Sequence, residues 1–418
     1  MNRSDNLEEL KMKMTQGTVT DANGFTAAGY AAGIKYQGRK DMAMICSSAP
    51  CHAAGVFTSN VVKAAPVLWD KKIVTESDAV YAVVVNSGIA NACTGKDGYE
   101  ICEKTAEAVG KELSVPADGV LIGSTGVIGM QIPIDKVTDG VKHLKTLLDD
   151  TQEAGIQAAE AIMTTDTHSK HLSVQFTLGT KTCHMGAMAK GSGMIHPNMC
   201  TMLCFITTDA AVSHTLLQKA LREVVVDTFN MISVDGDMST NDSLMILANG
   251  MAGNEEITEE NQDYQTFLEA LKLICTEMAK ALAGDGEGAT ALFETHVIHA
   301  DTKQNARILS KSVICSSLTK AAIYGHDANW GRILCALGYS GVQFDPDRVD
   351  LYIESAAGKM LLFHDGKAAD YSEEEATEIL SQKSVTALVD MRMGQEEATA
   401  WGCDLTYDYV KINADYRS

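Results

Sequence analysis

A threonine stands where a turn-rich segment meets an apolar run. Residues 191–210, GSGMIHPNMCTMLCFITTDA, carry two glycines and a proline and continue into a segment typical of a buried strand, with Thr201 at the junction. A threonine hydroxyl becomes an effective nucleophile when its own α-amine acts as the base, which requires the chain to begin at that threonine. A free α-amine has a pKa of about 7.7–8.0, so it can accept a proton near neutral pH. The pattern admits a nucleophile at a new N-terminus, with cleavage between Cys200 and Thr201.

The same hydroxyl can make the cut. It attacks the carbonyl carbon of Cys200, the peptide bond becomes an ester, and water hydrolyses the ester to release the new N-terminus. Taken alone, Thr201 is most simply a residue at the start of a strand. Cys200 is a second candidate for the working nucleophile.

The composition is that of a globular protein with an acidic surface. Of the 418 residues, 45% are apolar and 21% are charged; 55 acidic residues against 34 Lys and Arg give a net charge of −21. A chain this acidic has no general electrostatic attraction for nucleic acid or for an anionic membrane. We therefore expect no nucleic acid and no membrane among its partners.

The cysteines and the N-terminal residues indicate the cellular compartment of the protein. The 11 cysteines include no C-x-x-C pair, and no two Cys/His pairs have the spacing of a structural zinc site. The first ten residues, MNRSDNLEEL, contain no apolar core typical of a signal peptide, and no apolar run approaches the roughly 20 residues that span a bilayer. These features predict a cytoplasmic protein with reduced thiols and no metal site.

Short β-rich runs alternate with amphipathic helices, which predicts an α/β protein. Buried strands open the segments 79–95 and 120–129, and each continues into a polar loop that contains glycine. Alternation around Gly179 predicts a hairpin over 172–190. Apolar spacing predicts helices at 134–148, at 153–163, from Ser213 to about Phe229 and from Tyr264 to Leu282.

Three glycine-rich or acidic stretches resemble known binding motifs but lack residues that those motifs require. GDGEG (284–288) lacks the spacing and the lysine of a phosphate-binding loop, and GSTGVIG (123–129) lacks the order of a dinucleotide fingerprint. DGDMSTNDSLMI (235–246) begins like a calcium loop but has Thr240 at its sixth position and Ile246 at its twelfth.

One set of motifs does fit a family. The segment KGSGMIHPNMCTMLCFITTDA (190–210) resembles the self-cleavage region of the ornithine acetyltransferase / glutamate N-acetyltransferase family, which shows KGSGMI-x-PNMATML and is cut before the threonine. The resemblance extends over nearly the whole chain through further motifs in family order: NSGIANACTG (86–95), GSTGVIG (123–129), AIMTTDT (161–167), SVDGDMSTNDS (233–243), GEGATAL (286–292), DANWGRI (327–333) and INADYRS (412–418).

The resemblance implies a role for each matching residue. Thr201 would be both the self-cleaving residue and the nucleophile that accepts the acetyl group, and Thr125 and Gly126 would form the oxyanion hole. The residues expected to contact substrate are Thr164, Lys190, Thr201, Glu287, Asn413 and Ser418. The chemistry suggests that Lys190 meets the α-carboxylate of N-acetylornithine and that Glu287 meets its δ-ammonium group.

Three positions depart from the family pattern. Cys200 replaces the usual alanine before the cut, Ser418 replaces a common threonine, and Ala328 replaces a common proline. Cys200 is small, so we expect cleavage to survive, and Ser418 keeps a hydroxyl. Nothing in the sequence ties Ala328 to activity.

The resemblance implies a ping-pong acetyltransferase that moves acetyl from N2-acetylornithine to glutamate and gives ornithine and N-acetylglutamate in arginine biosynthesis. No cofactor is expected, and acetyl-CoA stays open as a second acetyl donor. The implied assembly is a heterotetramer with two copies of residues 1–200 and two of residues 201–418. The implied fold has stacked β-sheets flanked by helices, as in self-processing aminopeptidases, with a smaller C-terminal α/β region at about 290–418.

Two other functions stay open at this point. An N-terminal-nucleophile amidase or aminopeptidase on the same scaffold would pass the acyl group to water instead of glutamate. A non-catalytic protein that binds a small anion in its glycine-rich loops would remain uncut.

Overall fold

The chain divides into two compact units. The computed structural model describes residues 12–196 and 202–414. The first unit comprises Met1–Gly191, Asn198–Val226 and Met238–Met278, and the second comprises Ser192–Pro197, Asp227–Asp237 and Ala279–Ser418. Each unit contains one β-sheet with helices against it. The predicted mixed α/β class, with a smaller C-terminal α/β domain, is confirmed.

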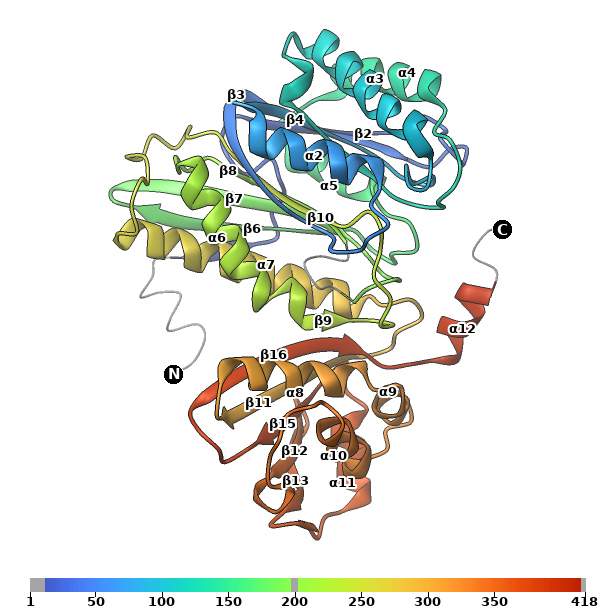
Figure 1. Ribbon diagram of the computed structural model, residues 1–418, viewed down its shortest axis with the longest axis vertical. Coiled ribbons are helices and arrows are strands. Elements are labelled where there is room, and N and C mark those ends of the chain that lie inside the picture. Colours follow the sequence, from blue (N-terminus) through green and yellow to red (C-terminus); the bar gives the residue numbers. More distant parts are fainter. Residues whose placement is uncertain (1–11, 197–201, 415–418) are drawn as a thin grey trace. The chain divides into compact units, whose positions relative to one another are not determined.

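The first unit is built on a nine-stranded sheet with the order β1-β6-β7-β8-β10-β3-β4-β5, and β2 pairs with β3 (Figure 1). Most pairs are antiparallel, but β8 lies parallel to β10 and β4 lies parallel to β5. The strands are β1 (Lys13–Thr15), β2 (Phe25–Tyr30), β3 (Met42–Phe57), β4 (Val80–Asn86), β5 (Val120–Ser124), β6 (Lys170–Leu178), β7 (Lys181–Lys190), β8 (Leu203–Thr208) and β10 (Ser243–Ala248).

The long strand β3 divides this sheet into two parts. Its first residues, from Met42 to Cys46, pair with β2 and β4, and its last residues, from His52 to Phe57, pair with β10. Buried side chains of both parts belong to one apolar cluster. A Cβ atom on Gly123 would lie 2.8 Å from the ring of Phe205, so β5 and β8 pack together closely. The two parts of the sheet therefore face each other across a shared core.

Within the described residues, six helices flank this sheet: α2 (Ala65–Glu76), α3 (Gly95–Leu113), α4 (Ile134–Leu147), α5 (Gln152–Ala161), α6 (His214–Val226) and α7 (Gln262–Gly284), the last of which continues into the second unit. The apolar spacing of the sequence predicted α4, α5, α6 and α7, but α2 and α3 were not predicted. The hairpin predicted over 172–190 is the β6–β7 pair, and Gly179 in its turn has a φ of 54°. No helix within the described residues is long and apolar enough to cross a membrane.

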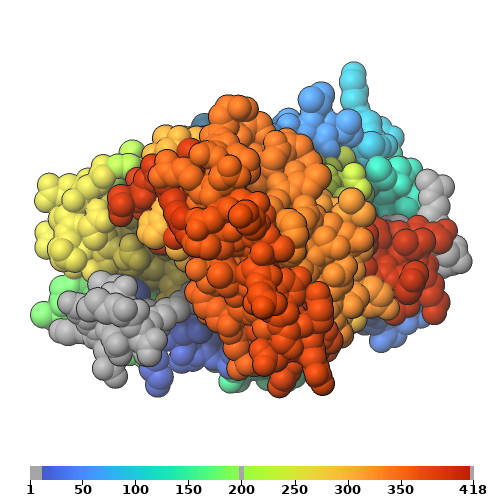
Figure 2. Space-filling model, turned by 90° about the horizontal axis from the view of Figure 1, so that it is seen from below, coloured from blue at the N-terminus to red at the C-terminus, as the bar shows by residue number. Residues whose placement is uncertain are grey.

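The second unit has a seven-stranded sheet with the order β14-β13-β12-β15-β11-β16-β9. Its strands are β9 (Ile232–Ser233), β11 (Leu292–Ala300), β12 (Asp350–Ser355), β13 (Gly358–His364), β14 (Lys367–Ala368), β15 (Ser384–Asp390) and β16 (Glu396–Cys403). Its helices are α8 (Lys303–Cys315), α9 (Ser317–Tyr324), α10 (Trp330–Gly338), α11 (Glu373–Leu380) and α12 (Tyr407–Ala414). Helix α8 packs across β11 and β16. The orange residues of this unit form one continuous surface in Figure 2.

Candidate functional site

Two loops leave the same edge of the first sheet. Because β4 and β5 are parallel, with Asn86 opposite Ser124, the loops that follow them emerge side by side. The Thr125 N–H donates to the Asn86 carbonyl over 3.0 Å, and the Val127 N–H donates to the Gly88 carbonyl over 3.2 Å. These backbone bonds fix the loop that contains Thr125 and Gly126, the predicted oxyanion hole.

Gly126 cannot be replaced at this place without a collision. Its φ is 128°, and a Cβ atom would lie 2.3 Å from the carbonyl carbon and 2.4 Å from the carbonyl oxygen of Gly88. Among the residues that the structure describes, the Gly126 N–H donates no hydrogen bond. The loop therefore leaves this donor available, as an oxyanion hole requires.

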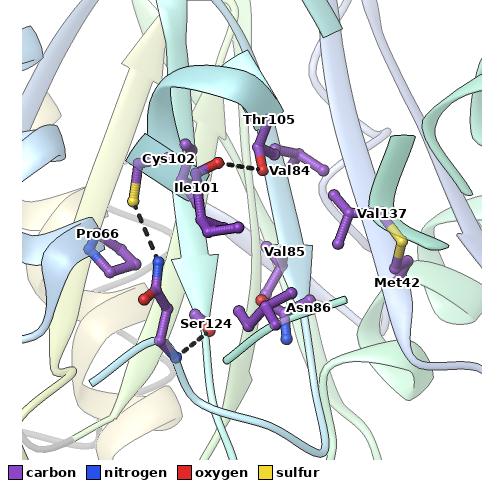
Figure 3. Close-up of a pocket in the computed structure, with 13 residues that line it drawn as sticks. Met42, Pro66, Val84, Val85, Asn86, Ile101, Cys102, Thr105, Ser124 and Val137 are labelled. Carbon is purple, nitrogen blue, oxygen red and sulfur yellow. Dashed lines mark hydrogen bonds between the residues drawn. The ribbon is translucent and has the colours of Figure 1, made fainter. Parts of the chain in front are cut away.

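The loop rests on a well-filled interior. Beside the ends of β4 and β5, a cavity of about 10 Å³ is lined mainly by apolar side chains of the two strands and of α3 (Figure 3). The Asn91 N–H donates to Ser124 Oγ over 2.9 Å, and Asn91 Nδ2 lies 3.4 Å from Cys102 Sγ. A space of this size holds about one water molecule, so it belongs to the support of the loop and not to a substrate site.

Lys190 connects the loop that contains Thr125 to a second loop, which contains Thr164. Its side chain, 9% exposed at the end of β7, donates from Nζ to Thr164 Oγ1 over 2.7 Å and to Thr125 Oγ1 over 3.2 Å. An ammonium group has no lone pair, so both threonine hydroxyls accept and keep their own hydrogens for other partners. Lys190 also lies opposite Leu203 in the β7–β8 pair.

A buried carboxylate that the sequence analysis did not single out supports Lys190. Asp166 Oδ1 accepts from Lys170 Nζ and from the Gly191 N–H, both over 2.7 Å. Burial alone would raise the pKa of Asp166, but the charges of Lys190 and Lys170 and the hydrogen bonds outweigh it and hold that pKa well below its usual range. Asp166 lies two residues after Thr164 in the motif AIMTTDT, and this position was the only hint that the sequence gave. The sequence could not show that two lysines are buried beside it.

The second unit holds the other predicted substrate contacts that the structure describes. Glu287 is 5% exposed, and its Oε2 accepts from Asn413 Nδ2 over 2.7 Å. Its backbone N–H donates to the Ser192 carbonyl over 2.9 Å. A Cβ atom on Gly193 would lie 2.4 Å from the Glu287 carboxylate, so a glycine is needed for this approach. Glu287 and Asn413 are thus brought together, on the loop after α7 and on α12.

Asp235, also missed from the sequence, anchors the segment 192–196. Its carboxylate accepts from the Met194 N–H over 2.6 Å and from the Ile195 N–H over 2.9 Å. The Tyr409 hydroxyl donates to the same carboxylate over 3.2 Å. The stretch that begins like a calcium loop thus uses its first aspartate to bind backbone N–H groups and the tyrosine.

The residues of the proposed cut, Cys200 and Thr201, lie outside the described residues, as does Ser418. The chain resumes at Met202, whose carbonyl accepts from the Ser243 N–H over 2.8 Å, and continues into β8. In the first unit, the structure brings together Thr125, Thr164 and Lys190, with Gly126 next in the chain to Thr125.

Comparison with known proteins identifies the family. The model of the ArgJ family matches residues 26–418. The arginine biosynthesis bifunctional protein ArgJ 1 of Clostridium acetobutylicum is 50% identical over 400 residues, which are 96% of this chain and 97% of that protein. The ArgJ protein of Thermotoga neapolitana is 50% identical over 397 residues, with 94% and 99% covered. A solved ornithine acetyltransferase from Mycobacterium tuberculosis, complexed with ornithine, is 41% identical and covers 46% of this chain and 100% of its own, with a TM-score of 0.42. The chain therefore belongs to the ArgJ family.

Proposed function

We propose that this protein is an arginine-biosynthesis acetyltransferase that moves the acetyl group of N2-acetylornithine to glutamate through an acetyl ester on Thr201. The family match and the shared name of the two curated relatives support this activity. The observation that carries the mechanism is the buried Lys190, which joins the loops of Thr125 and Thr164 beside the start of β8.

The first step of the proposal is self-cleavage. The Thr201 hydroxyl attacks the carbonyl carbon of Cys200, the C–N bond breaks, and an ester forms while the Thr201 nitrogen becomes a free amine. Water then hydrolyses the ester and leaves Cys200 with a carboxylate. Asp235 holds the backbone at Met194 and Ile195, and strand pairing holds the chain from Leu203 onward. Both flanks of the cut are thus fixed within their own units.

Acetyl transfer follows the same chemistry twice. The α-amine of Thr201 takes the hydroxyl proton, and the oxygen attacks the acetyl carbonyl of N2-acetylornithine. The developing oxyanion accepts from the Thr125 hydroxyl and from the Gly126 N–H. Ornithine leaves with the proton, and the acetyl ester remains on Thr201. The amine of glutamate attacks that ester, gives N-acetylglutamate and restores the hydroxyl.

Substrate recognition is assigned by charge. Lys190 would bind a substrate carboxylate, and Glu287 would bind the δ-ammonium of ornithine, with Asn413 orienting the Glu287 carboxylate through its 2.7 Å bond. Thr164 and Ser418 complete the proposed contacts. No metal or redox cofactor takes part in this scheme, and acetyl-CoA stays open as a second acetyl donor. We propose a cytoplasmic heterotetramer with two copies of each cleavage product.

The test is transfer of labelled acetyl. Purified protein is mixed with N2-[acetyl-¹⁴C]acetylornithine, with or without glutamate, beside a Thr201→Ala variant. We expect labelled N-acetylglutamate only from the wild type and only with glutamate present. Labelled acetate at the same rate with and without glutamate would instead identify the amidase that the sequence leaves open.

A further inference from the structure

We propose that Asp166 is a positioning residue of this site, whose buried carboxylate holds the loop of Thr164 and the backbone after Lys190 so that the Lys190 ammonium stays in place and charged. The inference rests on the proposed function, because it assigns to Lys190 the substrate carboxylate. Asp166 lies in the motif AIMTTDT, where the resemblance implies a role for Thr164 but none for Asp166.

Both oxygens of Asp166 are used. Oδ1 accepts from Lys170 Nζ and from the Gly191 N–H over 2.7 Å each, and Oδ2 accepts from the Thr164 N–H over 3.0 Å. Asp166 is 8% exposed, and the side chains of Asp166 and Lys170 are fully buried in their ion pair. Charge-assisted bonds of this kind are stronger than neutral ones, so this carboxylate fixes its three partners firmly.

These partners determine where the Lys190 ammonium lies. Gly191 follows Lys190 directly, so the bond to its N–H fixes the backbone at the end of β7. Thr164 supplies the hydroxyl that accepts from Lys190 Nζ over 2.7 Å. One carboxylate thus holds both the backbone beside Lys190 and the loop of a threonine whose hydroxyl accepts from the lysine.

Asp166 also supports the charge of Lys190. Burial disfavours a charged ammonium, and the neighbouring charge of Lys170 adds to that cost. Two described carboxyl groups, Asp166 and Asp242, interact electrostatically with Lys190. Burial raises the pKa of Asp242 well above its usual range, and Lys190 and Ser239 only partly oppose this. Asp166, whose pKa is held well below its usual range, supplies negative charge beside the two lysines.

The test compares Asp166→Asn with the double variant Asp166→Asn/Lys170→Met. Removing the carboxylate alone leaves two buried ammonium groups together, which disfavours the charged form of each. The KM for N2-acetylornithine should rise at least tenfold at pH 7 and rise further as the pH increases, because the Lys190 charge is lost at a lower pH. The double variant removes one of the two cations. Its KM, and the pH dependence of its KM, should therefore return most of the way to the wild-type values.

Asp41→Asn is the matched control. Asp41 is also buried, but its carboxylate accepts from the backbone N–H groups of a different loop, those of Ala32, Gly33 and Ile34. It should keep the wild-type KM and pH profile. A wild-type KM in Asp166→Asn at every pH would overturn the inference. A double variant whose KM is no lower than that of the single variant would also overturn it. If the single variant does not fold, the double variant decides: a KM with the same pH dependence as the wild type supports the inference, and a folded but inactive double variant opposes it.

The same data separate the inference from the function on which it rests. If the wild-type protein transfers no acetyl to glutamate, the proposed function fails. If the wild type transfers acetyl and the Asp166 variants show no change in KM or its pH dependence, the proposed function stands and only the role of Asp166 fails.

Discussion

At the scale of single residues, the site depends on close backbone approach. Gly126 lies so near the Gly88 carbonyl that only a hydrogen atom fits in place of a side chain. Its positive φ adds a conformation that side chains rarely adopt. The loop geometry explains why a glycine follows Thr125, which the sequence motif alone could not.

Gly126→Ala should therefore impair catalysis strongly. The methyl group must displace the Gly88 carbonyl or the Gly126 peptide, which misplaces the proposed oxyanion donor, and loss of one such donor typically reduces kcat about 10²–10³-fold. Steady-state acetyl transfer measures the effect. Gly338→Ala, where a Cβ atom meets nothing within 4 Å, is the control and should retain kcat. A Gly126→Ala enzyme with wild-type kcat would show that this loop does not stabilise the oxyanion.

Cys200→Ala separates the two candidate nucleophiles. If Thr201 reacts, replacing the preceding thiol with the alanine that the family carries should leave self-cleavage and acetyl transfer within about twofold of the wild type, since a side chain before the cut does not enter the chemistry. Gel analysis of the cleaved chains and an acetyl-transfer assay measure the two outcomes. Loss of acetyl transfer in a cleaved, folded Cys200→Ala protein would make Cys200 the nucleophile.

At the scale of elements, the sequence predicted several strands, helices and loops of the first unit, because their patterns are local. The alternation around Gly179 identified the β6–β7 hairpin, and the runs AVYAVVVN and VLIGS identified β4 and β5 with the polar loops after them. Asp166 and Asp235 escaped because their roles depend on partners distant in the sequence, such as Gly191 and Tyr409. Long-range contacts of this kind leave no periodic trace.

The packing of β8 against β5 should be important for stability. Phe205 is fully buried and its ring lies directly over Gly123, so Phe205→Ala leaves a cavity between the two parts of the first sheet. We expect a loss of about 3–5 kcal/mol in the free energy of unfolding, measured by urea denaturation. Leu318→Ala, at a side chain that is 62% exposed, should change it by less than about 0.5 kcal/mol. Equal stability of the two variants would mean that Phe205 is not part of a tightly packed core.

Helix α12 contributes one side chain to the proposed recognition of the ornithine amine. Asn413→Asp places a carboxylate where the amide now donates to Glu287 over 2.7 Å, so Glu287 loses the donor that orients it and faces a second acidic group. The KM for N2-acetylornithine should increase about tenfold or more at pH 7. Asn413→Asp with an unchanged KM would argue against a substrate role for Glu287.

At the scale of the whole molecule, the chain passes more than once between the two units. Residues 192–197 and 227–237 belong to the second unit although their neighbours in the sequence belong to the first. Linear composition gave no sign of this interleaving, because few prolines and no low-complexity linker mark the crossings. The division into residues 1–200 and 201–418 is a separate, covalent prediction, and it determines which chain ends the mature enzyme contains.

The most direct measurement is the intact mass of the denatured, purified protein, with Thr201→Ala measured beside it. We predict two fragments from the wild type whose masses place the break between Cys200 and Thr201, and one full-length chain from the variant. A wild-type chain that stays whole after prolonged incubation would contradict the account, because Thr201 would then have no α-amine to act as its base.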